Sequence, residues 1–466
     1  MSAPAMKPAG DSSVPHSHGA PASGSAAPSR RTAADSATSA NSRRSTIAAF
    51  VGTAIEWYDF YIFGTAAALV FGTVFYPELA PGAGLIASFA TFWVGFLARP
   101  VGGLIFSHFG DRFGRKNTLV ATLLLMGAGT MCIGLLPGYH TIGIAAPILL
   151  IVLRAVQGIA VGGEWGGAVV LATESASAGR RGMAGTWVQQ GSPAGAVLAT
   201  LAFMIVGMLP DEAFMSWGWR LPFLASAVLV LVALFIRLGV EESKDFEEVA
   251  ARNETPSVPV VEALRTSPGI IVAGVLASIT GIAFAYFTNT FLLAWTTGPL
   301  QMNRSVILNV LLIIAIVQFI WQPIAALIAE RIGARTVMVG GLFLSVIIAP
   351  ALFYAIQSGS ALLLGLVLSA NVLGATGYYA LLANALSEAF PARIRYTGVS
   401  VSYQLCATLF GGSTPVIAQW LLNATDGNAW IVMCLYLLLL ALTIIGTLAL
   451  LRGSARAAHN QQDDQR

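Results

Sequence analysis

At residues 110–116 the chain reads Gly110-Asp111-Arg112-Phe113-Gly114-Arg115-Lys116, which places four charged side chains between two apolar stretches. Each of those stretches is long enough to cross a bilayer. A related segment follows far downstream, Ala329-Glu330-Arg331-Ile332-Gly333-Ala334-Arg335. It keeps the acid, the first arginine, the glycine and the last base in register, and it also lies between apolar stretches. A charged turn that recurs at the same place in two halves of a chain predicts a duplicated helical bundle.

The composition indicates a membrane protein. Hydrophobic residues make up 56% of the 466 residues, charged residues make up only 10%, and the mean hydropathy is +0.74. Such a chain has too little polar surface to cover a water-soluble globule of this size. A duplicated bundle in a membrane makes a solute carrier the first hypothesis, with an integral membrane enzyme as the non-transport alternative. The sequence contains no His or Cys cluster of the kind that a catalytic or metal site needs, so we expect no enzyme activity and no metal.

Runs of about 20 mostly apolar residues, separated by Gly, Pro and charge clusters, predict twelve membrane-spanning helices. They lie at 46–74, 83–107, 117–137, 143–172, 182–209, 218–238, 268–293, 304–329, 336–356, 360–388, 397–423 and 429–451. The predicted fold is an all-α integral membrane protein with two pseudo-symmetric six-helix bundles, at 46–238 and 268–451. Between them, residues 239–267 are rich in Glu, Lys, Arg and Pro and predict a cytoplasmic interdomain loop, with an amphipathic surface helix at 241–251.

The positions of Lys and Arg predict the orientation. These bases lie in the even-numbered loops, whereas the odd-numbered loops are nearly free of them. Because short basic loops stay in the cytoplasm, both termini are expected on the cytoplasmic side. Residues 1–45 are dominated by Ser, Ala, Pro and Gly and predict a disordered cytoplasmic tail, with an organelle transit peptide as the alternative. Residues 452–466 predict a short cytoplasmic tail.

Two carboxylates in the first span are candidates for proton coupling. Glu56 and Asp59 are three residues apart, so they share one helix face and lie near the middle of the membrane. Neighbouring carboxylates favour the binding of a proton, and removal from water acts in the same direction. The alternative is structural, because either acid could neutralise Arg99 in the second span.

The fourth span carries a polar stripe of Arg154, Gln157 and Glu164 and a glycine stripe that includes Gly158 and Gly162. Glycines at this spacing allow a neighbouring helix to approach closely. Arg154, together with Gln157, could hold an anionic substrate, because a guanidinium group matches a carboxylate in shape and charge. An ion pair between Arg154 and a first-span acid is the alternative. Glu164 lies nearer the cytoplasmic end and is expected to be a gate or structural residue.

The spans of the second half carry amides and phenols, with almost no charge until Glu388. The coupling chemistry is therefore predicted in the first half, and the second half is expected to shape the substrate pocket. Tyr378, Tyr379 and Asn384 are the candidates for substrate contacts, although aromatic side chains in spans also serve packing.

The charged turns, the twelve spans and the central linker resemble the major facilitator superfamily over nearly all of residues 46–451. Further segments are similar to its metabolite:proton symporters, which include transporters of shikimate, 2-oxoglutarate, citrate and proline or betaine. These segments are Glu56-Trp57-Tyr58-Asp59-Phe60, Arg99-Pro100-Val101-Gly102-Gly103 and Trp217-Gly218-Trp219-Arg220-Leu221-Pro222-Phe223. The run Gly162-Gly163-Glu164-Trp165-Gly166-Gly167 is nearest to the shikimate type. None of these motifs specifies the individual substrate.

This resemblance implies a central cavity lined by spans one, four, seven and ten and open alternately to each side of the membrane. It also implies a cytoplasmic gate, in which Asp111 meets Arg115 and the positive N-terminal end of a helix from the other bundle. The second copy has Ala334 in place of the middle arginine, and Ser107 replaces the glycine that usually begins the first copy. The residues expected to act in gating are Arg99, Gly110, Asp111, Arg112, Gly114, Arg115, Lys116, Glu164, Glu330, Arg331 and Glu388.

The expected function is secondary active transport, with proton symport of a small organic acid into the cell by alternating access. Proton-coupled uptake of proline or betaine, and uncoupled or antiport export by the same fold, are the alternatives. The expected partners are a small carboxylate, protons and the lipid bilayer, without nucleic acid or cofactor. We expect a monomer in a bacterial inner (plasma) membrane.

Overall fold

The computed structural model of the chain describes residue 47, residues 50–113 and 115–162, residue 187, and residues 189–238, 259–391 and 394–463. Every regular element in these residues is helical, which confirms the predicted all-α class. The predicted tail at 1–45, the predicted surface helix at 241–251, and the residues Gly114 and Glu164 lie outside them.

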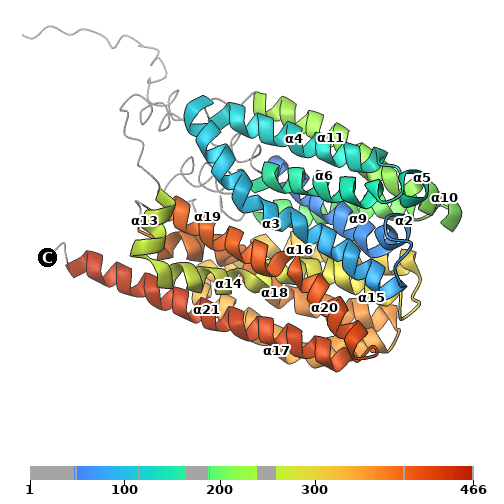
Figure 1. The fold of residues 1–466 in the computed structure, drawn as a ribbon. Helices are drawn as coiled ribbons and strands as arrows, with labels where there is room; N and C mark the ends of the chain where they lie inside the picture. Colours follow the sequence, from blue (N-terminus) through green and yellow to red (C-terminus); the bar gives the residue numbers. More distant parts are fainter. Residues whose placement is uncertain are drawn as a thin grey trace, which may run out of the picture. The chain divides into compact units, whose positions relative to one another are not determined.

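In the first half, a helix over residues 50–66 continues through a π-helical turn, η1 (Ala67–Phe71), into α2 (Gly72–Val74). The elements that follow are α3 (Pro81–Phe113), α4 (Arg115–Leu135), α5 (Tyr139–Ile142), α6 (Ala145–Gly162), α9 (Gly191–Val206), α10 (Asp211–Ser216), the 3-10 turn η2 (Gly218–Arg220) and α11 (Leu221–Leu238). α6 packs against α3 and α4, and α4 also packs against α11 (Figure 1).

In the second half, α18 packs against α16 and α17, and α14 packs against α21 (Figure 1). The elements are α13 (Pro259–Thr266), α14 (Pro268–Tyr286), the π-helical turn η3 (Phe287–Leu292), α15 (Leu293–Thr297), α16 (Arg304–Ile332), α17 (Ala334–Gln357), α18 (Ala361–Ala389), α19 (Arg395–Cys406), the π-helical turn η4 (Ala407–Gly411), α20 (Ser413–Ala424) and α21 (Ala429–Asp463).

These helices account for the predicted spans. Within the described residues, nine helical segments are long and apolar enough to cross a membrane. Two shorter apolar helices, Val120–Leu135 and Gly191–Val206, coincide with the predicted third and fifth spans. The helical segment from residue 50 to residue 74 coincides with the first. Each of the twelve predicted spans therefore has a helix, and the first, fourth and fifth are described only in part.

The charged stretch differs from the predicted turn in its extent. α3 continues to Phe113, past the expected end of the second span at residue 107, and α4 begins at Arg115. The second copy repeats this arrangement, because α16 ends at Ile332 and α17 begins at Ala334. Gly333 between them has a φ of +91°, which lies in the left-handed region that favours glycine. The predicted charged turn is therefore mostly helix, and in the second copy the helices are separated by one glycine.

Two other boundaries also differ from the prediction. α13 lies within the segment predicted as an interdomain loop, and α21 continues past residue 451 to Asp463. In both places charged residues suggested an end to regular structure. α13 nevertheless forms because its apolar side permits packing against α19, with Ala263 fully buried. The bundle and tail boundaries stay a prediction.

The glycine stripe of α6 lies directly against α3. A Cβ atom placed on Gly158 would overlap the carbonyl group of Gly95, and one placed on Gly162 would overlap the carbonyl group of Arg99. The predicted close approach of a neighbouring helix is therefore confirmed. Gly95 also leaves room for Arg154, because a Cβ atom there would lie 2.6 Å from the Arg154 Nε atom.

A proline in α3 creates a contact between the two halves. Pro100 lacks the N–H group that would bond to the carbonyl of Phe96, four residues earlier in the helix. That carbonyl instead accepts a hydrogen bond of 3.1 Å from the Thr408 hydroxyl of η4, in the second half. The Trp93 indole of α3 adds a 2.8 Å hydrogen bond to the backbone carbonyl of Thr408.

A matching contact occurs on α16, the counterpart of α3 in the duplication. Pro323 leaves the carbonyl of Phe319 without its intrahelical donor. This carbonyl accepts a hydrogen bond of 2.7 Å from the side-chain amide of Gln190, in the first half. In each half, a carbonyl freed by proline is therefore bonded to the other half.

The halves also meet through Arg304 at the start of α16, at the end of that helix opposite the charged stretch. The Arg304 Nη2 atom lies 3.2 Å from the Asp211 carboxylate and donates a 3.2 Å hydrogen bond to the carbonyl of Gly207. Its guanidinium group lies 3.9 Å from the centre of the Phe214 ring. One cation thus joins the loop after the fifth span to the eighth span.

Candidate functional site

Four charged side chains are buried in the described part of the chain: Glu56, Asp59, Arg99 and Arg154, all in the first half. Their exposed fractions are 4%, 1%, 5% and 0%. Charges at this depth are costly unless they are paired or serve a function. With both acids ionised, the four charges sum to zero.

Glu56 pairs with Arg99. The Glu56 Oε1 atom lies 3.9 Å from the Arg99 Nη2 atom, and both side chains are only 6% exposed. The Arg99 guanidinium group also lies over the rings of Phe60 and Phe96, at 4.3 and 4.7 Å from their centres. The ion pair with Arg99 is the structural alternative that the sequence left open for Glu56, and the roles of Glu56 and Asp59 in proton coupling stay predictions.

Asp59 is held by hydroxyl groups. Thr130 of α4 and Ser226 of α11 each donate a hydrogen bond of 2.8 Å to its carboxylate. Among the described residues, no cation lies within salt-bridge distance of this carboxylate. Sequence reasoning missed both hydroxyl residues, because Ser and Thr are common in apolar spans and only the packing of α4 and α11 brings these two to Asp59.

Arg154 is enclosed by aromatic rings. Its guanidinium group lies 4.4, 4.2 and 4.9 Å from the ring centres of Phe60, Phe63 and Phe92. The Nη1 atom donates a 3.1 Å hydrogen bond to the side chain of Gln157. Within the described residues the Nη2 atom has no hydrogen-bond partner. Cation–π contacts stabilise the guanidinium charge without using its N–H groups. The Nη2 atom therefore remains available as a hydrogen-bond donor.

A hydrogen-bonded chain connects Arg154 to Asp59. Arg154 donates to Gln157, the Gln157 amide donates to the Thr130 hydroxyl at 2.7 Å, and the Thr130 hydroxyl donates to Asp59. The sequence predicted Arg154, Gln157 and Asp59 as functional residues, and the structure brings all three together. The sequence did not predict Thr130, which lies between Gln157 and Asp59. The charges of Arg154 and Asp59 are therefore linked without direct contact.

A small cavity of about 30 Å³ lies between the two halves. Tyr61 and α9 contribute from the first half, and α14, α16 and α18 contribute from the second. Its lining residues are Tyr61, Ser192, Pro193, Thr280, Gly281, Phe284, Ala285, Gln318, Gln322, Ala375, Thr376 and Tyr379. A cavity of this size holds about two water molecules, so a larger ligand requires the cavity to open.

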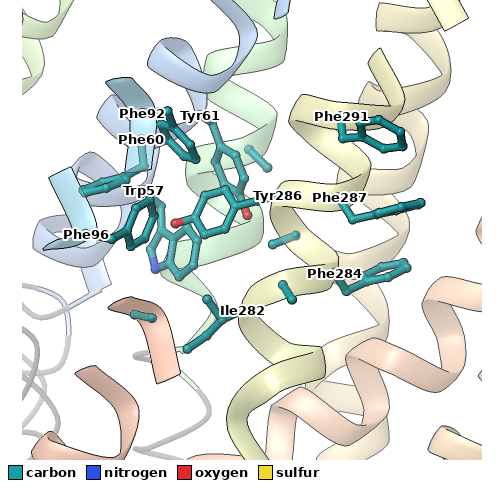
Figure 2. Packing of buried hydrophobic residues seen from close by; sticks show 14 of the residues in the cluster. Trp57, Phe60, Tyr61, Phe92, Phe96, Ile282, Phe284, Tyr286, Phe287 and Phe291 are labelled. Atoms are coloured by element: carbon teal, nitrogen blue, oxygen red, sulfur yellow. The ribbon is translucent and has the colours of Figure 1, made fainter. Parts of the chain in front are cut away.

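An aromatic cluster connects the cavity to the buried charges. The Tyr286 ring stacks on that of Trp57, with ring centres 6.0 Å apart, and lies beside Tyr61. Figure 2 shows these three side chains on one side of α14, whereas Phe284 and Phe287 leave from its opposite side. Tyr286 also contacts the ring of Phe96, over which the Arg99 guanidinium group lies. Sequence reasoning missed Tyr286, because nothing in the sequence distinguishes it from a packing tyrosine.

The comparisons with known proteins agree with this architecture. Residues 45–272 match a family model described as "Sugar (and other) transporter". The chain is 40% identical to the shikimate transporter of Escherichia coli over 423 residues, which cover 89% of this chain and 95% of the relative. The chain belongs to the major facilitator superfamily. Within it, the resemblance to the metabolite:proton symporters is confirmed.

Other relatives place the chain among transporters of small metabolites. It is 41% identical to an inner membrane metabolite transport protein of E. coli, covering 80% of this chain and 87% of that one. It is 34% identical to the E. coli proline/betaine transporter, covering 82% and 78%. The chain is thus a multi-pass membrane transporter and not an enzyme, and it acts on a small molecule.

Solved structures of the superfamily share the fold. The crystal structure of a D-xylose-proton symporter matches with a TM-score of 0.67 at 19% identity, over 88% of this chain and 96% of that one. A partially occluded inward open structure of the E. coli xylose transporter matches with a TM-score of 0.68 at 18% identity, over 88% and 97%. These matches confirm two pseudo-symmetric bundles of six helices.

Of the five predicted substrate residues, Arg154 and Gln157 are buried beside Asp59 and are not part of the cavity lining. Tyr379 lines the cavity, and its hydroxyl lies 3.1 Å from that of Tyr403. Tyr378 points elsewhere, because its hydroxyl donates to the carbonyl of Ala277 and lies 3.0 Å from the Thr447 hydroxyl. Asn384 is half-buried on α18 and is not part of the cavity lining.

The predicted gating residues lie mostly at the ends of α3, α4, α16 and α18. Glu330, Arg331 and Glu388 are exposed, whereas Arg99 is buried beside Glu56. Gly110, Asp111 and Arg112 belong to α3, and Arg115 and Lys116 begin α4. The side chains of those last five residues, with Gly114 and Glu164, lie outside what the structure describes.

Proposed function

We propose that this transporter carries a small monocarboxylate together with one proton, with Asp59 as the proton-binding residue. The observation that supports this most strongly is the charge balance of the buried cluster, which is neutral when both acids are ionised. A proton on Asp59 leaves one excess positive charge near Arg154, and a monocarboxylate neutralises that excess. Binding of either partner therefore favours binding of the other, which is the thermodynamic requirement for symport.

In this proposal Arg154 contributes the attraction for the anion. Its unpartnered Nη2 atom is a donor for a carboxylate, and Gln157 holds the guanidinium plane in position. Tyr379 is proposed as a substrate contact from the second half, because it lines the cavity. The likeness to a shikimate transporter supports a carboxylate substrate.

We also propose the gating and membrane orientation expected from the sequence. In this proposal the buried pair of Glu56 and Arg99 helps to close the cavity from the first half. Asp111 and Arg115 would lock the cytoplasmic side. Both termini would face the cytoplasm of a bacterial inner membrane, as the basic loops indicate, and the protein would act as a monomer.

The experiment compares Asp59→Asn with the wild type in proteoliposomes. With shikimate, citrate and glycine betaine as probes, the wild type should accumulate a monocarboxylate when the outside is acidic. Asp59→Asn should lose all accumulation above equilibrium but retain exchange of internal for external substrate, because the neutral amide mimics the protonated acid. Asp426→Asn, at an exposed turn, serves as the matched control. Uphill accumulation by Asp59→Asn would refute the assignment.

A second candidate function is uptake of a betaine-like osmolyte. The observation that favours it is the aromatic cluster of Trp57, Tyr61 and Tyr286, since aromatic faces attract quaternary ammonium groups. The likeness to proline/betaine transporters points the same way. Because a betaine is a zwitterion, its symport with a proton would carry net charge, which distinguishes it from a monocarboxylate.

A further inference from the structure

The second-half wall of the cavity is polar but neutral. Among the described residues, no charged side chain lines it. Gln318 and Gln322 are four residues apart on α16, so they share one helix face. When the two halves are aligned so that Asp111 corresponds to Glu330, Arg99 corresponds to Gln318. The second half therefore carries an amide at the position where the first half carries a cation.

Gln322 is the most unusual polar group on this wall. Its side chain is fully buried, and neither its Nε2 atom nor its Oε1 atom has a hydrogen-bond partner within the described residues. A buried amide without partners is costly, because it has left water and gained no replacement bond. An amide retained at this cost on the wall of a cavity indicates a ligand that satisfies it.

The chemistry of an amide restricts that ligand. The Nε2 atom donates two hydrogen bonds and the Oε1 atom accepts them. A hydroxyl group both donates and accepts, so neighbouring hydroxyls satisfy the whole amide. A carboxylate only accepts and would leave Oε1 unpaired, whereas a quaternary ammonium group neither donates nor accepts. The Thr376 and Ser192 side chains on the same lining add hydroxyl groups.

We propose that Gln322, with Gln318 one turn earlier, forms a subsite for hydroxyl groups of the substrate. The substrate is then a hydroxylated monocarboxylate: its carboxylate is attracted by the first half, and its hydroxyl groups bind the amides of α16. This inference rests on the proposed transport of a monocarboxylate. It adds a specificity-determining residue and excludes polycarboxylates and betaines as preferred substrates.

Matched pairs of compounds test the subsite in proteoliposomes. Quinate and cyclohexanecarboxylate share a ring and a carboxylate, and gluconate and hexanoate share a chain length and a carboxylate. In the wild type, at least one hydroxylated acid should be transported and should compete about 100-fold better than its deoxy counterpart, because an unpaired buried amide penalises the latter. Equal competition within both pairs, or preference for citrate or glycine betaine, would overturn the proposal.

The variant Gln322→Leu keeps the size of the side chain and removes its hydrogen bonds. It should raise KM for the hydroxylated acid about 10- to 100-fold and abolish the preference within the pair. Asn371→Leu is the control, since Asn371 is a buried amide on α18 outside the cavity lining. Ligand-induced thermal stabilisation in detergent gives a second readout that does not depend on transport. An unchanged preference in Gln322→Leu would overturn the subsite.

A pH-sensitive dye inside the vesicles separates this inference from the proposed function. If hydroxylated acids are selected through Gln322 but their transport moves no protons, the result supports the subsite and refutes the symport. Proton influx driven by carboxylates without regard to their hydroxyl groups would retain the symport and refute the subsite.

Discussion

At the scale of residues, Asp59 and Arg154 carry opposite charges and are connected without direct contact. Gln157 accepts a hydrogen bond from Arg154 and donates one to Thr130, which in turn donates one to Asp59. A direct ion pair would hold both charges fixed, and breaking it would be costly in this buried setting. A chain of neutral groups lets Asp59 gain or lose a proton while Arg154 keeps its aromatic contacts. In the proposed mechanism Thr130 therefore positions Asp59 for the coupling.

Replacement of Thr130 by valine tests that role. The variant keeps the shape of the side chain but removes a donor to the ionised form of Asp59, so a proton should bind more readily. We expect the pH at half-maximal uptake to rise by about one unit, with the maximal rate changed by less than about threefold. Thr447→Val, at another buried threonine, should leave the pH profile unchanged. A lower rate with an unshifted profile would indicate a structural role only.

The sequence identified the charged residues but not their partners. Glu56, Asp59, Arg99 and Arg154 stand out because charge is rare in apolar spans. Thr130, Ser226 and Tyr286 do not, since their residue types also serve packing. Tyr378 and Tyr379 show most clearly that residue type alone does not identify a residue that lines the cavity. They are adjacent on α18, and only the rotation of the helix decides that Tyr379 faces the cavity while Tyr378 bonds to Ala277.

At the scale of elements, the proline-containing helices α3 and α16 explain how the halves touch and still move. Each proline frees one carbonyl, and a single side chain from the other half bonds to it. Such isolated bonds, which lie about one helical turn apart when the two halves are aligned, can break and re-form as the bundles rock, whereas a continuous apolar interface would resist motion. Apolar runs predicted these helices well. The ends of α3 and α21 were predicted less well, because both helices continue through charged residues at which the sequence predicted an end.

A double-mutant cycle tests the contact at Phe319. Gln190→Leu removes the donor from the first half and should lower the stability of the solubilised protein by about 1 kcal/mol. In a Pro323→Ala background the loss should be smaller, because the alanine N–H group then bonds to the same carbonyl. Thr408→Val removes the donor to the Phe96 carbonyl. Its effect on stability should add independently to that of Pro323→Ala. Melting temperatures in detergent measure all of these effects, and strict additivity of Gln190→Leu with Pro323→Ala would contradict the contact.

At the scale of the whole molecule, the duplicated halves have diverged in chemistry. The four buried charges of the described chain lie in the first half, and the cavity wall of the second half carries amides and hydroxyls. The charged stretch shows the same divergence, because Ala334 replaces the arginine that corresponds to Arg115. The fold retains the symmetry that alternating access uses. In the proposed mechanism one half carries the coupling and the other recognises the neutral part of the substrate.

In the proposed mechanism one proton enters with one monocarboxylate, so that no net charge moves. The most direct measurement is uptake of labelled quinate or gluconate into proteoliposomes in which valinomycin and potassium set the membrane potential while buffers set the pH difference. We predict accumulation with an acidic exterior at zero potential, and no accumulation from an inside-negative potential at equal pH. Accumulation driven by the potential alone, or uptake indifferent to the pH difference, would contradict the account.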